Sequence, residues 1–281
     1  MSTLLATLSQ RSLKVGKMAD KCAWLIAWGE AVDPAAQLVA GAARQYGLNV
    51  KGQHWPEKEK QAWLASAKEA AQANAAVVLL VVTHAVYALP ENRRALALFR
   101  LSLQTLLNRQ IDGVILLQGE ASAAAPSGLF GEAVLSNWMV VGPTDKWVAR
   151  AVARAHAPAK SSLPARLSIY AEERLGVWLE VRPNTTEPVQ GFIAGVSGPS
   201  ADITFHAVGL SGRLPERSVN EYELRGLKFE TEGLAFYAWG LRNQIAADQS
   251  YFIRLDGEPD VIAFGALPDG EISELEFVRL A

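Results

Sequence analysis

The sequence predicts two architectures in one chain, a parallel sheet covered by helices and then a β-rich region. The run Ala75–Thr83 is apolar or β-branched throughout and does not alternate, which is typical of a strand buried on both faces of a parallel sheet. Amphipathic helical stretches flank this run, whereas beyond residue 164 the hydrophobic period changes from helical to two. We therefore expect an α/β domain followed by a β-sandwich or barrel.

Short apolar runs alternate with helical segments through the first half of the chain. The five expected strands are Cys22–Trp28, Leu48–Gln53, Ala75–Thr83, Asp112–Gln118 and Asn137–Val141. Helices are expected to begin at Asp33-Pro34, with the aspartate as the N-cap, and at Pro56, Pro90 and Asp145. This alternation implies right-handed crossovers and a doubly wound sheet. By analogy with flavodoxin-like domains, we expect the strand order 2-1-3-4-5.

The change of period coincides with a stretch bounded by prolines. Ala157–Pro164 has small or polar residues between prolines, as linkers do. We therefore expect a flavodoxin-like domain over residues 1–157, a linker over residues 158–164 and a β-rich domain over residues 165–281. Residues 1–21 are expected to be a leader, and Glu120–Ser127 an exposed loop.

The composition and charge of the chain exclude or disfavour several classes of protein. Half of the 281 residues are hydrophobic and a fifth are charged, which excludes global disorder. A net charge of −2 with mixed signs disfavours direct nucleic-acid binding, although a role inside a nucleoprotein complex stays open. The single cysteine, Cys22, allows no internal disulfide and suits a reducing cytoplasm. Because neither a signal-peptide pattern nor a run of about 18 apolar residues is present, we expect a cytoplasmic protein that does not cross a membrane.

No motif in the sequence indicates a particular reaction. Neither GxxxxGK[ST] nor GxGxxG follows an expected strand, so a cradled phosphate or dinucleotide is disfavoured. The absence of GxSxG excludes a nucleophile elbow. The four histidines share no metal-binding spacing, and we expect neither a metal nor a cofactor.

A binding crevice is nevertheless expected where the strand order reverses, beyond the carboxyl ends of the first and central strands. The loops there carry Glu30, His84 and Glu91, which could serve as acid–base residues. The same edge offers three residues for binding a ligand: Asp33, Trp55 and Tyr87. Ordinary roles explain some of these residues equally well, because Asp33 suits a helix cap and Trp55 suits a cover over the core.

The element order of the first half resembles that of flavodoxin-like domains, which include the TIR-like and nucleoside deoxyribosyltransferase-like groups. Those groups cleave N-glycosidic bonds with a glutamate. The resemblance implies one hypothesis, an enzyme acting on a nucleotide or NAD N-glycoside. Glu30 or Glu91 would then be the catalytic carboxylate, with His84 assisting proton transfer. Trp55 or Tyr87 would stack on the base.

The absence of catalytic signatures favours a different hypothesis, a non-catalytic protein that binds a ligand or a protein partner. The α/β domain would be a rigid platform or would sense a small nucleotide-like ligand, and the β-rich domain would bind the partner, which could be a second copy. The polar loop Ser211–Asn220 offers Arg213, Glu216 and Arg217 to a partner, although a solvated loop explains them as well. This hypothesis predicts an exposed apolar patch or an uncovered sheet edge, most of all on the β-rich domain.

Overall fold

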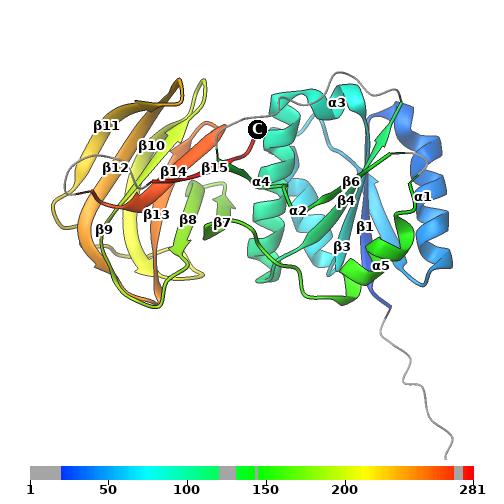
Figure 1. Ribbon diagram of the computed structural model, residues 1–281, viewed down its shortest axis with the longest axis horizontal. Coiled ribbons are helices and arrows are strands. Elements are labelled where there is room, and N and C mark those ends of the chain that lie inside the picture. Colours follow the sequence, from blue (N-terminus) through cyan, green and yellow to red (C-terminus); the bar gives the residue numbers. More distant parts are fainter. Residues whose placement is uncertain (1–19, 120–130, 143–144, 269–274) are drawn as a thin grey trace, which may run out of the picture.

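The computed structural model describes residues 20–119, 131–142, 145–268 and 275–281. A five-stranded parallel sheet flanked by helices occupies one half of the molecule, and two mostly antiparallel sheets form the other half (Figure 1). The expected fold class is confirmed. The expected leader, apart from Asp20 and Lys21, and the expected loop Glu120–Ser127 lie outside the described residues. No helix within the described ranges is long and apolar enough to span a membrane.

The parallel sheet has the predicted strand order, β2-β1-β3-β4-β6. Its strands are β1 (Cys22–Trp28), β2 (Asn49–His54), β3 (Val77–Thr83), β4 (Asp112–Gln118) and β6 (Met139–Val141). All residues of the central strand β3 except Thr83 are buried. Its sequence is continuously apolar because helices cover both faces of the sheet.

The helices divide between the two faces. Helices α1 (Asp33–Gln45) and α5 (Val148–His156) pack on one face, and α2 (Ala62–Gln72) and α4 (Pro90–Leu107) pack on the other. Successive side chains of a strand point to opposite faces. In β1, Ala23 and Ala27 accordingly contact the core under α1 and α5, while Trp24 and Trp28 belong to the core under α2 and α4.

Two helix starts differ from the sequence prediction. Pro56 does not open a helix, because residues 57–61 form turns and α2 begins at Ala62. The last helix begins at Val148 and not at Asp145, whose carboxylate instead accepts a hydrogen bond from the backbone N–H of Gly142 at 2.7 Å. In both places the expected starting residue serves a turn before the helix.

The N-cap predicted at Asp33 is also wrong. A short 3₁₀ helix, η1 (Glu30–Val32), precedes α1, so Val32 occupies the cap position without a side-chain hydrogen bond and Asp33 is the first residue of α1. A further short helix, α3 (His84–Ala88), replaces the expected loop after β3. The hydroxyl of Thr83 caps α3 by accepting a hydrogen bond from the backbone N–H of Val86 at 3.3 Å.

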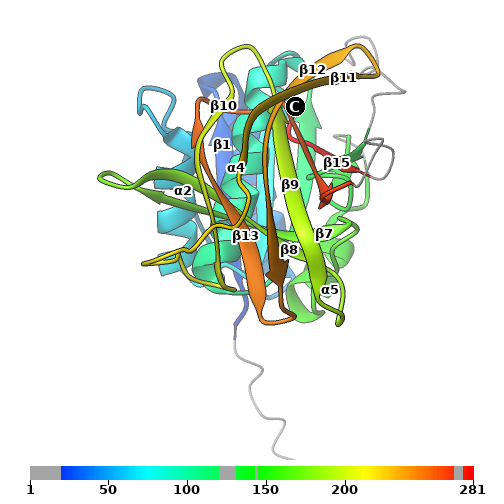
Figure 2. The ribbon, with the colours of Figure 1, turned by 90° about the vertical axis from the view of Figure 1, so that its left-hand side faces the viewer.

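The β-rich half is a sandwich of two sheets, ordered β10-β13-β8-β7 and β11-β12-β9-β14-β15-β5. The strands are β5 (Glu132–Ala133), β7 (Ala165–Glu172), β8 (Gly176–Pro183), β9 (Val189–Ser197), β10 (Asp202–Leu210), β11 (Leu224–Thr231), β12 (Leu234–Ile245), β13 (Gln249–Asp256), β14 (Val261–Ala266) and β15 (Glu276–Arg279). Leu179 and Ile253 from one sheet share a core with Ala194 and Phe264 from the other. Figure 2 shows the sandwich strands standing in front of the helices.

The two halves are joined by more than the linker. Strand β5, which lies between β4 and β6 in the chain, pairs in parallel with β15 of the six-stranded sheet. Helix α4 runs against β7, where the hydroxyl of Thr105 accepts a hydrogen bond from the backbone N–H of Ile169 at 3.0 Å. Nε of Arg94 lies 3.2 Å from the carboxylate of Asp260. One continuous apolar cluster therefore extends from the parallel sheet through α4 into the sandwich.

Candidate functional site

An open depression lies beyond the carboxyl ends of β1 and β2, near the expected crevice. It is lined by Glu30, Asp33, His54 and Trp55, among others. Nε2 of His54 is 3.6 Å from the Asp33 carboxylate, and these side chains are 64% and 45% exposed. Ion pairs this exposed contribute at most about 1 kcal/mol. The depression thus brings a carboxylate and an imidazole together, but in water-accessible surroundings.

Trp55 offers little surface to a ligand. Its ring stacks on Trp28, with the centroids 4.1 Å apart and the planes 12° from parallel, and it meets Phe99 edge-on at 6.0 Å. Only 6% of the residue is exposed. Trp55 therefore covers the core at the floor of the depression.

The other residues predicted for this edge do not line the depression. Tyr87 lines a separate pocket with Arg93 and Val134, and burial raises the pKa of its hydroxyl above the ordinary value. His84 opens α3, and Glu91 is exposed in the first turn of α4. The expected acid–base set of Glu30, His84 and Glu91 is thus not brought together around one depression. Within the described part of the chain, no group of three or more His, Cys, Asp or Glu side chains is placed to hold a metal ion.

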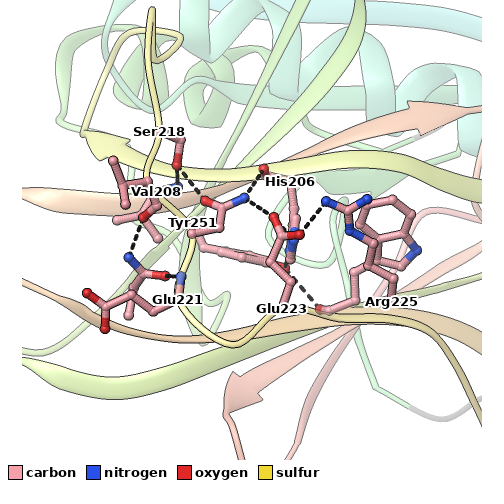
Figure 3. Close-up of polar contacts among 11 residues, drawn as sticks. His206, Val208, Ser218, Glu221, Glu223, Arg225 and Tyr251 are labelled. Carbon is pink, nitrogen blue, oxygen red and sulfur yellow. Dashed lines mark hydrogen bonds and ion pairs between the residues drawn. The ribbon is translucent and has the colours of Figure 1, made fainter.

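A second candidate site lies where residues 211–223, the loop that joins β10 to β11, run along the edge of the sandwich. The hydroxyl of Ser218 accepts a hydrogen bond from the backbone N–H of Val208 at 3.2 Å (Figure 3). Nδ2 of Asn220 donates to the backbone carbonyl of His206 at 3.1 Å. The loop therefore satisfies backbone groups of β10, which is the end strand of its sheet.

A buried polar centre fastens this loop. His206 is fully buried, with Nδ1 2.7 Å from the Tyr251 hydroxyl and Nε2 3.3 Å from the Glu223 carboxylate. The Tyr251 hydroxyl also donates to the backbone carbonyl of Trp239 at 3.0 Å. Arg225 donates to the other Glu223 oxygen, and its guanidinium lies 5.2 Å from the centroid of the Trp239 ring. In Figure 3 the side chains of His206, Arg225 and Tyr251 come from β10, β11 and β13 and lie around Glu223.

The pKa values in this centre are set by burial and by the hydrogen bonds among its members. Burial lowers the pKa of His206, because the imidazolium would lose its hydration, and Glu223 only partly opposes that effect. The hydrogen bond from Asn220, assisted by Arg225, lowers the pKa of Glu223. Burial raises the pKa of the Tyr251 hydroxyl. Full burial keeps the His206 imidazole out of contact with solvent, while the side chains of Glu223 and Arg225 at the rim of the centre stay 24% and 55% exposed.

The end of the loop presents apolar side chains to solvent. Val219 and Tyr222 are 82% and 79% exposed, more than any other large apolar residue that the structure describes. Nδ2 of Asn243 donates to the carbonyl of Val219, and its Oδ1 accepts from the backbone N–H of Glu221, both at 2.7 Å. Tyr222 has φ of 47°, a left-handed conformation that costs energy for a non-glycine residue and persists only where its surroundings hold it. We call residues 219–224 the apolar tip.

The sequence pointed to this loop but to different residues within it. Arg213, Glu216 and Arg217 are exposed in its first part, as expected for residues that contact solvent or a partner. The apolar tip was missed, although Val219 and Tyr222 interrupt an otherwise polar stretch and were a usable signal. His206 gave no such signal, because its partners Glu223 and Tyr251 are distant in the sequence.

No protein-family model matches the chain, and neither a curated protein nor a solved structure matches it. The function is therefore inferred from the geometry of this chain alone.

Proposed function

We propose that this protein is a non-catalytic interaction protein, in which the β-rich domain binds a protein partner through the apolar tip and the adjoining edge of β11. The α/β domain serves as the platform that carries the sandwich. The observation that carries this proposal is the exposure of Val219 and Tyr222 on a loop that Asn243 and the His206 centre hold in place.

Two further features support an interface there. Leu224, the last residue of the apolar tip, is 38% exposed, and Tyr237 on β12, which pairs with Lys228 of β11, is 40% exposed. Strand β11 is the end strand of the six-stranded sheet, so one of its edges has no strand beside it in the described chain. Aromatic side chains on a pre-ordered loop are efficient binding residues, because little entropy is lost when the partner binds.

The test is a quantitative affinity purification that compares Tyr222→Ala with Tyr46→Ala. Tyr46, at the end of α1, is 59% exposed and is the matched control for losing an exposed tyrosine. We expect one partner, retained by the wild-type chain and by Tyr46→Ala, to bind Tyr222→Ala about 30-fold more weakly, as for a hot-spot residue. If every bound protein tolerates Tyr222→Ala, the apolar tip is not the binding surface.

Cleavage of a nucleotide or NAD N-glycoside remains the second candidate, favoured by one observation: Glu30, Asp33 and His54 line the same depression. A thermal-shift screen of nucleotides, nucleosides and NAD, with product analysis of each hit, separates the two functions. The interaction function predicts no shift that depends on Glu30. A shift abolished by Glu30→Gln, with a cleaved product, would instead support the enzyme.

A further inference from the structure

Strand β11 ends in a turn that determines which of its backbone groups are free. Glu232 and Gly233 form the two-residue turn to β12, with φ of 48° and 73°, and Thr231 pairs with Leu234 across it. In a turn of this type the closing pair is hydrogen-bonded, and bonded and non-bonded pairs alternate along the hairpin. Thr231, Phe229 and Leu227 therefore bond to β12.

The backbone N–H and C=O groups of Lys228 and Glu230 consequently point away from β12. Because β11 is the end strand, no strand of the described chain meets them. Both residues are exposed, and their side chains share one face of the strand. The free edge therefore carries two donors and two acceptors, flanked by one positive and one negative side chain.

Three antiparallel registers would let these groups meet the same groups on a second copy. Opposing Lys228 to Lys228, or Glu230 to Glu230, brings like charges face to face, which destabilises a strand pair. The third register opposes Lys228 to Glu230 twice, once on each side of a twofold axis through Phe229. That register satisfies all the free groups and makes two attractive charge pairs.

Building on the proposed function, we propose that the partner is a second copy of this chain, which pairs antiparallel along β11 with Lys228 opposite Glu230. A register shift between Leu224 and Leu227 ends the regular ladder, so the pairing covers residues 227–231 and the apolar tip borders it. Five paired residues bury less than a standard interface, so the dimer is reversible and depends on concentration.

Sedimentation velocity of the full chain over a range of concentrations tests this pairing. Lys228→Glu and Glu230→Lys each place like charges opposite one another twice per dimer, and each is expected to raise the dissociation constant about tenfold or more. The double variant, Lys228→Glu with Glu230→Lys, opposes unlike charges again and is expected to return to within about threefold of the wild type. A dimer that is equally strong in all four proteins would overturn the register.

A register-specific cross-link provides a second measurement that does not depend on charge. In the proposed register Leu227 lies opposite Thr231 of the other copy, so Leu227→Cys mixed with Thr231→Cys should form a disulfide-linked dimer under mild oxidation, while neither variant does so alone. Cys22 is buried and does not compete. Equal cross-linking in the mixture and in the separate variants would overturn the pairing.

The outcomes also separate this proposal from the one it builds on. A wild-type chain that stays monomeric up to its solubility limit would overturn self-pairing, while a different partner that is lost in Tyr222→Ala would still support the interaction function. A dimer that Lys228→Glu disrupts and the double variant restores supports both.

Discussion

Removing the side chain of Asn243 should release the apolar tip without unfolding the sandwich. Asn243 is half-buried and makes two hydrogen bonds of 2.7 Å, one to the carbonyl of Val219 and one from the N–H of Glu221. Each such bond contributes about 0.5–1.5 kcal/mol net. Asn243→Ala removes both bonds and is therefore expected to lower the free energy of unfolding by about 1–3 kcal/mol and to raise the open population of the tip about 5- to 160-fold.

The matched control is Asn184→Ala. Nδ2 of Asn184 donates to the backbone carbonyls of Leu163 and Pro164, at 3.3 and 2.9 Å, where the chain enters the sandwich. Urea unfolding should show a comparable loss of stability in both variants. Hydrogen exchange at Glu221 and partner binding should change only in Asn243→Ala, because only that variant frees the tip.

Two results would refute this reasoning. Unchanged exchange at Glu221 in Asn243→Ala would mean that other contacts hold the tip. Equal weakening of partner binding in both variants would mean that global stability, and not the order of the tip, controls the affinity.

Three further predictions concern other parts of the chain. Gly113→Ala would place a Cβ 2.4 Å from the Trp138 ring and should lower the free energy of unfolding by about 1–3 kcal/mol in chemical denaturation. Gly41 lies in α1 with open space around it, so Gly41→Ala should raise the free energy of unfolding by up to about 1 kcal/mol in the same assay. Thr105→Val removes the acceptor for the backbone N–H of Ile169 in β7 and should lower the free energy of unfolding by about 1 kcal/mol. Hydrogen exchange should become faster in β7 alone, and an equal increase throughout the chain would contradict this prediction. Because the folded-state pKa of His206 lies below its unfolded value, the stability from its neutral form is present above the unfolded pKa and is lost as the pH falls through the folded pKa. Stability measured from about pH 7 to about pH 5.5 should therefore fall more steeply in the wild type than in His206→Gln, and equal slopes would show that this histidine is not the group responsible.

The parallel sheet could be predicted because its signal is local. Val77–Thr83 is a continuous apolar run, and any strand covered on both faces must be apolar at every position. Pro90 likewise marked the start of α4 correctly, since its missing N–H suits the first turn of a helix. The same rule failed at Pro56, because proline suits a turn as well as the first turn of a helix. The helix there begins only at Ala62, and its residue Trp63 packs in the core.

The candidate sites could be predicted only in part, because their geometry depends on contacts between separate elements. The approach of Asp33 to His54 follows from the adjacency of β1 and β2, which the predicted strand order already contained. Trp55 could not be assigned from sequence, because a loop tryptophan covers a core or faces a ligand according to its neighbours, here Trp28 and Phe99.

The sequence by itself determined the two-part architecture, the five parallel strands and their helices, since each depends on the hydrophobic period of a short segment. Only the tertiary structure decided the rest. The pairing of β5 with β15, and the burial of His206 between Tyr251 and Glu223, join residues far apart in the chain. Such contacts depend on how the sheets stack and on which edge stays open, and no local period encodes either.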